Sequence, residues 1–344
     1  LWRRGALAEF AQSRGLSVQS CDKTNGFDWQ AVKRLRTEVK QFKPQVMHTH
    51  NYMAHYYAVA SKLGLRIPMI INTRHSMGAK ALSDRGERLY QLAMLGTDYS
   101  AMVCEAARAR FVEHGSVRAD KAVVVRNGVE LSRFEMRSDA ARARICAQLG
   151  LNPSAIVFGS VGRRTPVKCQ TLMLQALKQV HRAGVPASFA LAGDGELRSA
   201  LEAETRLLQL EDSVRFLGAR SDVPAILQSL DVFLLSSRSE GYSLALVEAS
   251  ASGLPIIATN VGGNAEIVQN GVTGMVIDSQ NVDALAGAML LMAKQPDLRK
   301  NLSQGARDWA LQVGSLEAMV NSYEGLYQRR KPAPLTNQVS QLSA

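Results

Sequence analysis

Two glutamates, Glu240 and Glu248, stand with seven residues between them in the stretch SEGYSLALVEASASGLPIIATNVGG, residues 239–263. A carboxylate only accepts hydrogen bonds, so both side chains suit the paired hydroxyls of a sugar. The turn between them comes just before a short apolar segment that predicts a helix. Unpaired backbone N–H groups at the start of a helix favour a phosphate. The spacing therefore predicts a turn that binds hydroxyls on both sides of a diphosphate, the outline of a nucleotide sugar.

The same stretch contains the elements that would position these side chains. Residues 231–235 (DVFLL) and 255–259 (PIIAT) predict two buried strands, with a helix between them from near Ser243 to Gly253. In a parallel α/β sheet, ligands bind beyond the carboxyl ends of the strands. The acidic pair is therefore expected on a strand-to-helix turn at that edge. The alternative for any one glutamate is a solvated helix charge.

Other candidate residues follow further predicted strands in the same half of the chain. Arg163 and Lys168 flank a turn at a helix entrance, where two cations and free N–H groups can bind phosphates. Gly193 and Gly195 form a tight turn that lets a ligand approach the backbone closely. Arg220 lies in the loop after another strand, at the same edge of the sheet. Charged turn residues are often only solvated, so each signal by itself is weak.

One histidine of the first half, His75, has a comparable position. Residues 68–72 (PMIIN) predict a strand, and His75 lies just past its carboxyl end. That end of a strand is where a sheet of this class presents functional groups. A lone histidine is more often structural or merely exposed, so both interpretations stay open at this point.

The composition bounds the class of protein. The chain has 344 residues, 46% of them hydrophobic and 21% charged, as is typical of a globular protein. Two domains of roughly 150 residues are the first expectation for this length. No apolar run approaches the ~20 residues needed to span a bilayer. The four cysteines show no paired spacing, which argues against a zinc site or a disulfide framework and favours a reducing cytosol.

The net charge of +11 is concentrated in the first half of the chain. Residues 1–150 hold 24 Lys+Arg against 13 Asp+Glu, and the remainder holds 17 against 17. Such asymmetry suggests that this half meets something acidic, either anionic lipid headgroups or nucleic acid. Aromatic residues are few (6%) and no nucleic-acid motif appears, so an anionic membrane is the preferred partner. A generally basic, solvated surface is the alternative.

Strands and helices alternate along both halves, as expected for doubly wound parallel sheets. The pattern begins with a helix over residues 2–14 and a strand over residues 16–18. A strand and a glycine-rich turn would normally precede that helix. Because the chain begins with Leu1 and contains neither, we expect its natural N-terminus to be missing.

Together these residues resemble the retaining glycosyltransferases of family 4. That family has the GT-B fold, in which two Rossmann-like, doubly wound parallel-sheet domains face each other across a cleft. The resemblance covers roughly residues 2–330, and its most specific part is the Glu240 and Glu248 pair with the Gly262-Gly263 turn after the next strand. The supporting matches are Gly162-Arg163 with Lys168, Gly193-Asp194-Gly195, the VRFLG strand at 214–218, and Asn127-Gly128-Val129.

The resemblance implies a domain organisation. Residues 1–150 would form an acceptor-side domain that lacks its first strand and glycine-rich loop. Residues 151–312 would form the domain that binds the nucleotide sugar. Residues 313–330 would form a helix that packs back toward the first domain, and residues 331–344 a disordered tail.

The resemblance also implies a role for each candidate residue. Arg163 and Lys168 would neutralise the donor diphosphate and stabilise the leaving nucleoside diphosphate. Glu248 would bind the ribose hydroxyls and Glu240 those of the transferred sugar, while His75 matches the family histidine that reaches the donor sugar. The remaining donor contacts would come from the turns and the base-framing loop: Gly193, Gly195, Arg220, Gly241, Tyr242, Ser243 and Leu244. We count Glu240, His75, Arg163 and Lys168 as catalytic.

The expected reaction is retaining transfer of a hexose from a nucleotide-diphosphate sugar to a glycan or lipid-linked acceptor. It would serve bacterial-type cell-surface polysaccharide or lipopolysaccharide biosynthesis. We expect no metal and no cofactor, because cations here replace the metal that other transferases use. The expected location is cytoplasmic, with a peripheral position on the inner face of the membrane and no nucleic-acid partner.

Two alternatives remain open. The same fold serves nucleotide-sugar 2-epimerases, although the glutamate pair with Arg163 and Lys168 favours transfer. A basic, non-catalytic binding protein would explain the charge of the first half. The sequence also departs from the family pattern where Cys169 stands in place of the usual glycine, a change of size that we expect to be tolerated.

Overall fold

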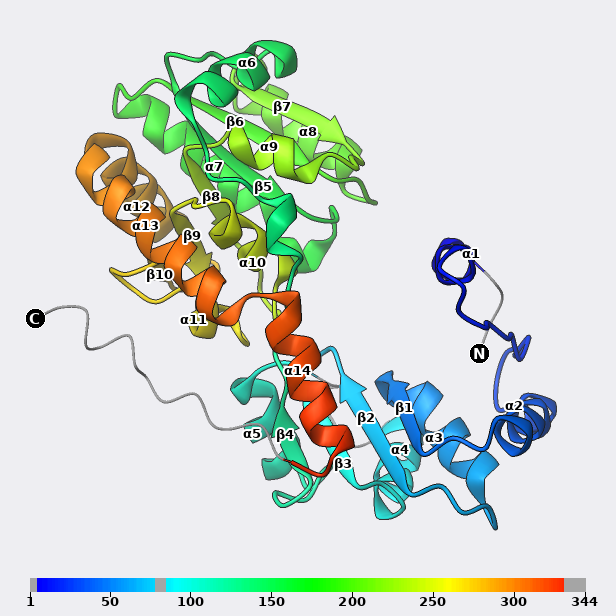
Figure 1. Ribbon diagram of the computed structural model, residues 1–344. Coiled ribbons are helices and arrows are strands. Elements are labelled where there is room, and N and C mark those ends of the chain that lie inside the picture. The colour runs from blue at the N-terminus through cyan, green and yellow to red at the C-terminus, as the bar shows by residue number, and fades with distance from the viewer. Residues whose placement is uncertain (1–4, 78–84, 331–344) are drawn as a thin grey trace, which may run out of the picture. The chain divides into compact units, whose positions relative to one another are not determined.

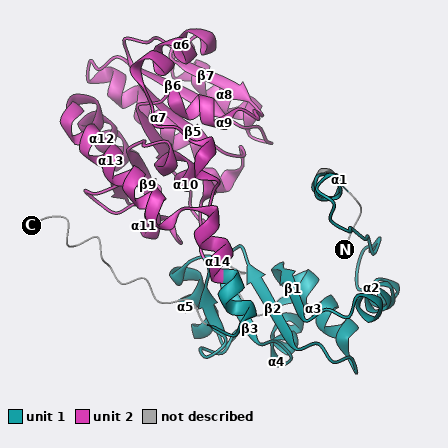
Figure 2. Cartoon of the chain, in the orientation of Figure 1, with its two compact units in different colours: residues 1–125, 323–344 teal, residues 126–322 magenta. Residues whose placement is uncertain are grey.

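The computed structural model describes residues 5–77 and 85–330 (Figure 1). The chain divides into two compact units: unit 1 comprises Leu1–Val125 with Tyr323–Ala344, and unit 2 comprises Arg126–Ser322 (Figure 2). The division falls at Val125, whereas the sequence placed the end of the first domain at residue 150. The expected tail, residues 331–344, lies outside the described residues.

Unit 1 is built on a four-stranded parallel sheet in the order β1-β2-β3-β4. Its strands are β1 (Val46–His50), β2 (Met69–Arg74), β3 (Tyr99–Met102) and β4 (Ala122–Val124). Its helices are α1 (Ala6–Ser13), α2 (Trp29–Phe42), α3 (Asn51–Lys62), α4 (Arg85–Leu95) and α5 (Glu105–Glu113). Each strand is followed by a helix up to β4, the alternation that right-handed parallel connections require.

One sequence expectation for unit 1 differs from the structure. The strand expected at residues 16–18 is not formed: Leu16 is 63% exposed, and its backbone N–H donates to the Ala11 carbonyl of α1 at 3.1 Å. A backbone N–H that closes the end of a helix is not available to a sheet. Strand β1 continues to His50, and α3 begins at the next residue.

Unit 2 contains a six-stranded parallel sheet in the order β10-β9-β8-β5-β6-β7. Its strands are β5 (Ile156–Val161), β6 (Ala187–Ala192), β7 (Val214–Gly218), β8 (Val232–Leu235), β9 (Ile256–Thr259) and β10 (Gly274–Ile277). Its helices include α6 (Asp139–Leu149), α7 (Gln170–Arg182), α8 (Arg198–Leu207), α9 (Val223–Gln228), α10 (Leu244–Ala251), α11 (Asn264–Ile267), α12 (Val282–Lys294) and α13 (Pro296–Val313). Helix α14 (Leu316–Tyr327) begins in unit 2 and ends in unit 1.

The core of unit 2 explains why its strands are nearly all apolar. A sheet covered by helices on both faces buries every side chain of its central strands. On one face, α7 and α12 pack together over Phe158, Phe189 and Leu234. Helices α10 and α13 pack on each other, and α10 contacts β8 and β9.

The strand order places β5 and β8 side by side in the middle of the sheet. From β5 the chain continues to β6 and β7 on one side, and from β8 to β9 and β10 on the other. The connections that follow β5 and β8 therefore lead to opposite sides of the sheet. This topological switch point is where open α/β sheets bind ligands.

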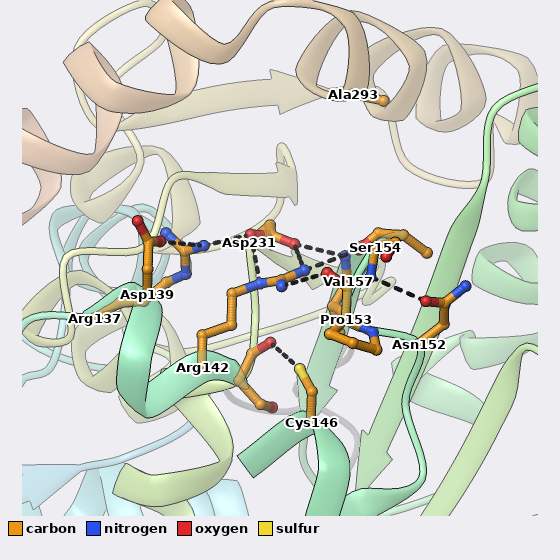
Figure 3. A network of polar contacts seen from close by, with 12 residues as sticks. Arg137, Asp139, Arg142, Cys146, Asn152, Pro153, Ser154, Val157, Asp231 and Ala293 are labelled. Carbon is orange, nitrogen blue, oxygen red and sulfur yellow. Dashed lines mark hydrogen bonds and ion pairs between the residues drawn. The ribbon is translucent and has the colours of Figure 1, made fainter. Parts of the chain in front are cut away.

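A polar network centred on Asp231 ties α6 to the opposite, amino-terminal edge of the same two strands (Figure 3). The Asp231 carboxylate accepts hydrogen bonds from Arg137 at 2.8 Å, from Arg142 at 2.7 and 3.0 Å, and from the Val157 backbone N–H at 2.7 Å. The Cys146 thiol of α6 also donates to the Ser229 carbonyl at 3.5 Å. These contacts give the physical reason that residues 139–149 belong to unit 2.

Candidate functional site

The loops after β5 and β8 meet through an ion pair between Lys168 and Glu240. Lys168 Nζ lies 2.5 Å from Glu240 Oε1, and the Ser237 hydroxyl donates to the same oxygen at 2.5 Å. The side chains of Lys168 and Glu240 are 22% and 11% exposed. Two of the four predicted catalytic residues, 72 positions apart in the sequence, are thus in direct contact at the switch point.

The backbones of these loops are also joined, which holds the ion pair in place. The Ser236 hydroxyl lies 2.9 Å from the carbonyl oxygens of both Lys168 and Cys169. The Arg238 backbone N–H donates to the Val167 carbonyl at 2.8 Å. The Thr259 hydroxyl, at the end of β9, donates to the Ser237 carbonyl at 2.7 Å. The site is therefore supported by three neighbouring strands.

The glycine turn after β9 fits closely against the Glu240 backbone. Gly262 has a φ of +54°, and a Cβ placed there would lie 1.8 Å from the Glu240 carbonyl oxygen. The Gly263 N–H donates to the Gly241 carbonyl at 2.8 Å. Only glycine allows both this conformation and this approach. The Gly262-Gly263 match found in the sequence therefore has a definite role, which is to support the loop that contains Glu240.

The start of α10 leaves backbone donors unpaired beside Glu240. The first hydrogen bonds of the helix run from the Leu246 and Val247 N–H groups to the Ser243 carbonyl. The N–H groups of Leu244 and Ala245 have no acceptor among the described residues. Tyr242 and Ser243 are buried, whereas Leu244 is exposed. The N–H groups of Leu244 and Ala245 thus remain available as donors at a helix N-terminus, where they favour an anion.

Glu248 lies one turn further along α10 and is partly buried. Its carboxylate forms no hydrogen bond with any residue that the structure describes. Burial raises its pKa, and the nearby Arg133 guanidinium opposes that rise. A buried carboxylate without hydrogen-bond donors is costly unless a ligand supplies them. Glu248 is therefore placed to accept hydroxyl groups.

The Gly193 and Gly195 turn stacks against the loop after β5. Gly193 has a φ of +117°, and a Cβ placed there would lie 2.0 Å from the Gly162 carbonyl oxygen. Gly195 has a φ of +155°, and a Cβ placed there would lie 2.5 Å from the Arg164 carbonyl oxygen. The Gly193 N–H donates to the Gly218 carbonyl at 2.7 Å. Both glycines thus act through the close packing of three loops.

The arginines of this edge have three different environments. Arg163 is exposed, and its guanidinium has no partner among the described residues. Arg164, which the sequence did not single out, is buried, donates to the Leu191 carbonyl at 3.0 Å and lies over the Phe216 ring. Burial lowers the pKa of Arg164.

Arg220 forms a two-point ion pair with Asp222 of its own loop at 2.6 and 2.7 Å. Among Arg163, Arg164 and Arg220, only Arg163 presents an unpaired cation to the solvent.

The fourth predicted catalytic residue, His75, belongs to a cluster in unit 1. His75 Nε2 lies 2.9 Å from His50 Nδ1, and the two rings stack with centroids 5.1 Å apart. The His50 ring stacks in turn on His48, with centroids 4.6 Å apart. His48 Nδ1 lies 2.7 Å from the Tyr327 hydroxyl of α14, and His48 Nε2 lies 2.8 Å from the Thr73 hydroxyl.

Strand geometry explains how these side chains come together. His50 pairs in register with Thr73, and residues two apart on a strand point to the same face. His48, His50, Thr73 and His75 therefore share one face of the sheet. The opposite face carries Thr49, whose hydroxyl lies 2.9 Å from His55 Nδ1.

Sequence reasoning missed His48, His50 and the α14 tyrosines as members of this cluster. The His-Thr-His spacing was a usable signal for the histidines, because a strand with period two would have paired them on one face. Tyr323, whose hydroxyl lies 2.9 Å from that of Thr73, and Tyr327 come from 250 or more positions further along the chain and had no such signal.

The environments of His48, His50 and His75 favour the neutral form of each ring. Burial lowers the pKa of His48 to about 4, and the neighbouring His50 and His75 lower it further. Burial, together with the His75 charge, lowers the pKa of His50, and burial lowers that of His75. At neutral pH the three rings therefore act as hydrogen-bond donors and acceptors rather than as cations.

Within the described ranges, no group of three or more His, Cys, Asp and Glu side chains could hold a metal ion. The same part of the chain has no helix that is long and apolar enough to cross a membrane.

Two family models match the chain and together cover most of it. The model of glycosyl transferases group 1 matches residues 141–309, and that of glycosyltransferase family 4 matches residues 5–133. The match to glycosyltransferase family 4 lies in unit 1 and the first residues of unit 2. The match to glycosyl transferases group 1 lies in unit 2.

Several enzymes are similar to this chain over most of its length. It is 27% identical to the UDP-Gal:alpha-D-GlcNAc-diphosphoundecaprenol alpha-1,3-galactosyltransferase of Escherichia coli, over 87% of this chain and 79% of that protein. It is 26% identical to the N-acetyl-alpha-D-glucosaminyl L-malate synthase of Bacillus anthracis, over 88% and 79%. The Anabaena Alr3699/HepE structure with UDP matches with a TM-score of 0.86 at 20% identity, over 95% of this chain and 90% of that one. The chain thus belongs to the family 4 glycosyltransferases and has their GT-B fold.

Proposed function

We propose that the protein transfers a hexose, with retention of configuration, from a nucleotide-diphosphate sugar to a glycan or lipid-linked acceptor. The observation that carries this proposal is the meeting of Lys168 and Glu240 beside the unpaired N–H groups of α10. One small region thereby offers a cation, a carboxylate and helix N–H donors. A sugar diphosphate needs all three.

Lys168 and Arg163 supply the positive charge for the leaving nucleoside diphosphate in this proposal. Fixed cations that face developing negative charge lower the barrier, because they need no reorganisation during the reaction. Lys168 is already held by Glu240, and Arg163 is exposed and unpaired within the described chain. We propose that these cations take the part that a metal ion plays in other transferases.

The hydroxyl groups of the donor are assigned to the carboxylates. Glu248 accepts those of the ribose, a role supported by its partial burial without hydrogen-bond donors. Glu240 accepts the hydroxyl groups of the transferred sugar. His75 contacts the same sugar, as the family resemblance implies. The loop with Gly218 and Arg220 frames the base. Retention would follow from front-face attack through an oxocarbenium-like transition state, since we assign no nucleophile to the opposite face.

The names of two relatives suggest the type of acceptor and pathway. The Escherichia coli relative is named for a sugar on diphosphoundecaprenol, which is a lipid-linked acceptor. A matching structure is described as the lipopolysaccharide outer core galactosyltransferase WaaB. We propose by analogy that the protein acts in the synthesis of a cell-surface polysaccharide or lipopolysaccharide.

We propose that the basic first half brings the protein to the cytoplasmic face of an anionic membrane. Lys33, Arg34, Arg36 and Lys40 lie on α2, which also carries the exposed aromatic side chains Trp29 and Phe42. Basic residues beside aromatic ones suit an interface with anionic lipid. Sedimentation with liposomes should show more binding to anionic than to neutral vesicles at low salt. Equal partition onto the two kinds of vesicle would contradict this part of the proposal.

Thermal-shift measurements with UDP, GDP, ADP and NAD, each with and without EDTA, test the function. We expect one nucleoside diphosphate to stabilise the protein by about 2.7 kcal/mol at 100 times its Kd. UDP is the first candidate, because structural neighbours of this fold are described as complexes with UDP and UDP-glucose. EDTA should leave the shift unchanged.

Glu248→Gln should abolish most of that stabilisation, whereas Glu211→Gln should not. Glu211 is an exposed glutamate of unit 2 and serves as the matched control. Absence of a shift with any nucleotide would contradict the proposed function. Conversion of the donor sugar at C2 without an acceptor would instead favour the 2-epimerase.

A further inference from the structure

The contact between His50 and His75 lies outside the roles assigned so far. Both rings lie at the carboxyl edge of the unit 1 sheet, where they are partly covered and partly open to solvent, and their facing nitrogens lie only 2.9 Å apart. A separation of 2.9 Å requires one nitrogen to carry a proton and the other to present its lone pair. The pair therefore shares one hydrogen, and the tautomers of the two rings are coupled.

We propose that His50 is a positioning residue of the transfer reaction, which hydrogen-bonds His75 Nε2 and thereby fixes the tautomer and ring plane of His75. The inference rests on the proposed function, in which His75 contacts the transferred sugar. His50 itself touches no reacting atom in this scheme.

The direction of the hydrogen bond follows from the chemistry of imidazole. The Nε2–H tautomer is the more stable form of a neutral histidine side chain. If His75 Nε2–H donates to His50 Nδ1, both rings have that form. The reverse direction would force both rings into the less stable Nδ1–H form. The arrangement therefore leaves His75 Nδ1 as a bare acceptor, which is suited to a sugar hydroxyl.

The position of His50 is itself well supported. Its ring stacks on His48, whose two nitrogens lie at hydrogen-bond distance from the hydroxyls of Tyr327 and Thr73. The Thr73 hydroxyl lies in turn 2.9 Å from that of Tyr323. The side chains of β1, β2 and the end of α14 thus form a layer against which His50 rests. Loss of His50 would free His75 to rotate and to exchange its tautomer, which would remove the acceptor for part of the time.

The test compares His50→Ala with His50→Asn in the full chain. The Oδ1 of an asparagine occupies nearly the position of a histidine Nδ1, so His50→Asn can still accept from His75. Long-range ¹H–¹⁵N spectra of ¹⁵N-histidine-labelled protein report the tautomer of His75. Steady-state kinetics use the nucleotide sugar whose nucleoside diphosphate stabilises the protein.

We expect His75 to be an Nε2–H tautomer in the wild type and in His50→Asn, and a mixture in His50→Ala. The kcat of His50→Ala should fall on the order of 10- to 100-fold, as misplacement of a contacting group does, while KM for the donor changes little. The kcat of His50→Asn should stay close to that of the wild type.

Three results would overturn the inference. The first is an Nδ1–H tautomer of His75 in the wild type, and the second is an unchanged kcat in His50→Ala. The third is an equal loss of kcat in both variants, which would point to ring packing rather than to the hydrogen bond. Failure of the wild type to turn over any donor would refute the proposed function instead, and the spectra would still decide whether His50 sets the tautomer.

Discussion

Lys168→Ala is expected to lower kcat/KM for sugar transfer by about 10²- to 10³-fold, the usual loss when one preorganised charge-stabilising group is removed. The physical reason is that Lys168 Nζ, held 2.5 Å from Glu240, is a fixed cation at the sheet's switch point. A leaving diphosphate carries charge that this ammonium group would stabilise. The measurement is steady-state transfer with the donor whose nucleotide stabilises the wild type.

The matched control for this prediction is Lys300→Ala. Lys300 is an exposed lysine of α13, so its replacement removes the same charge from the protein without touching the site. Its kcat/KM should equal that of the wild type. The melting temperature of Lys168→Ala should show that the protein still folds. Activity close to that of the wild type in a folded Lys168→Ala would remove this lysine from the proposed chemistry.

Asp231→Asn is expected to destabilise unit 2 by roughly 3–5 kcal/mol, the cost of breaking a buried charge pair. The carboxylate neutralises Arg137 and Arg142 and also accepts from the Val157 N–H. The amide N–H₂ of asparagine would face N–H donors that the carboxylate accepts from in the wild type. The guanidinium groups of Arg137 and Arg142 would also lose their counter-charge. Chemical denaturation followed by a probe in unit 2 measures the change in the free energy of unfolding.

Asp139→Asn provides a close comparison, because Asp139 also faces Arg137, at 3.4 Å, but its side chain is 96% exposed. A solvent-exposed ion pair contributes at most about 1 kcal/mol, so this variant should differ little from the wild type in stability. Similar small losses in both variants would show that the Asp231 network does not hold α6 to the sheet. Since Asp231 lies at the edge away from Lys168 and Glu240, donor affinity should change in neither folded variant.

Much of the candidate site could be predicted because its residues lie in the loops that follow strands. In a parallel sheet all carboxyl ends lie at one edge, so each strand predicted from its apolar run also places the loop after it. Lys168, Glu240 and the Gly193 turn were located in this way. The alternation of strands and helices likewise predicted both sheets, because the connection between parallel strands needs a helix.

The sequence predicted local backbone conformation less well than it predicted the order of strands and helices. Cys169 was judged as a change of size from the usual glycine, but its φ is +50°, in the left-handed region. A side chain there costs about 1–2 kcal/mol in backbone energy, which a comparison of residue volumes does not reveal. Residues 16–18 show the converse, since their side-chain pattern predicts a strand, whereas the Leu16 N–H closes the end of α1 instead.

The sequence by itself determined the family, the two-sheet architecture and the residues that follow each strand, because periodicity, glycine turns and motif spacing are properties of neighbouring positions. Only the tertiary structure decided which of those residues touch. The Lys168 and Glu240 pair, the Asp231 network and the contact of Tyr327 with His48 join residues 72, 89 and 279 positions apart. Such contacts depend on strand order and register, which arise from the packing of the whole unit and leave no local signal in the chain.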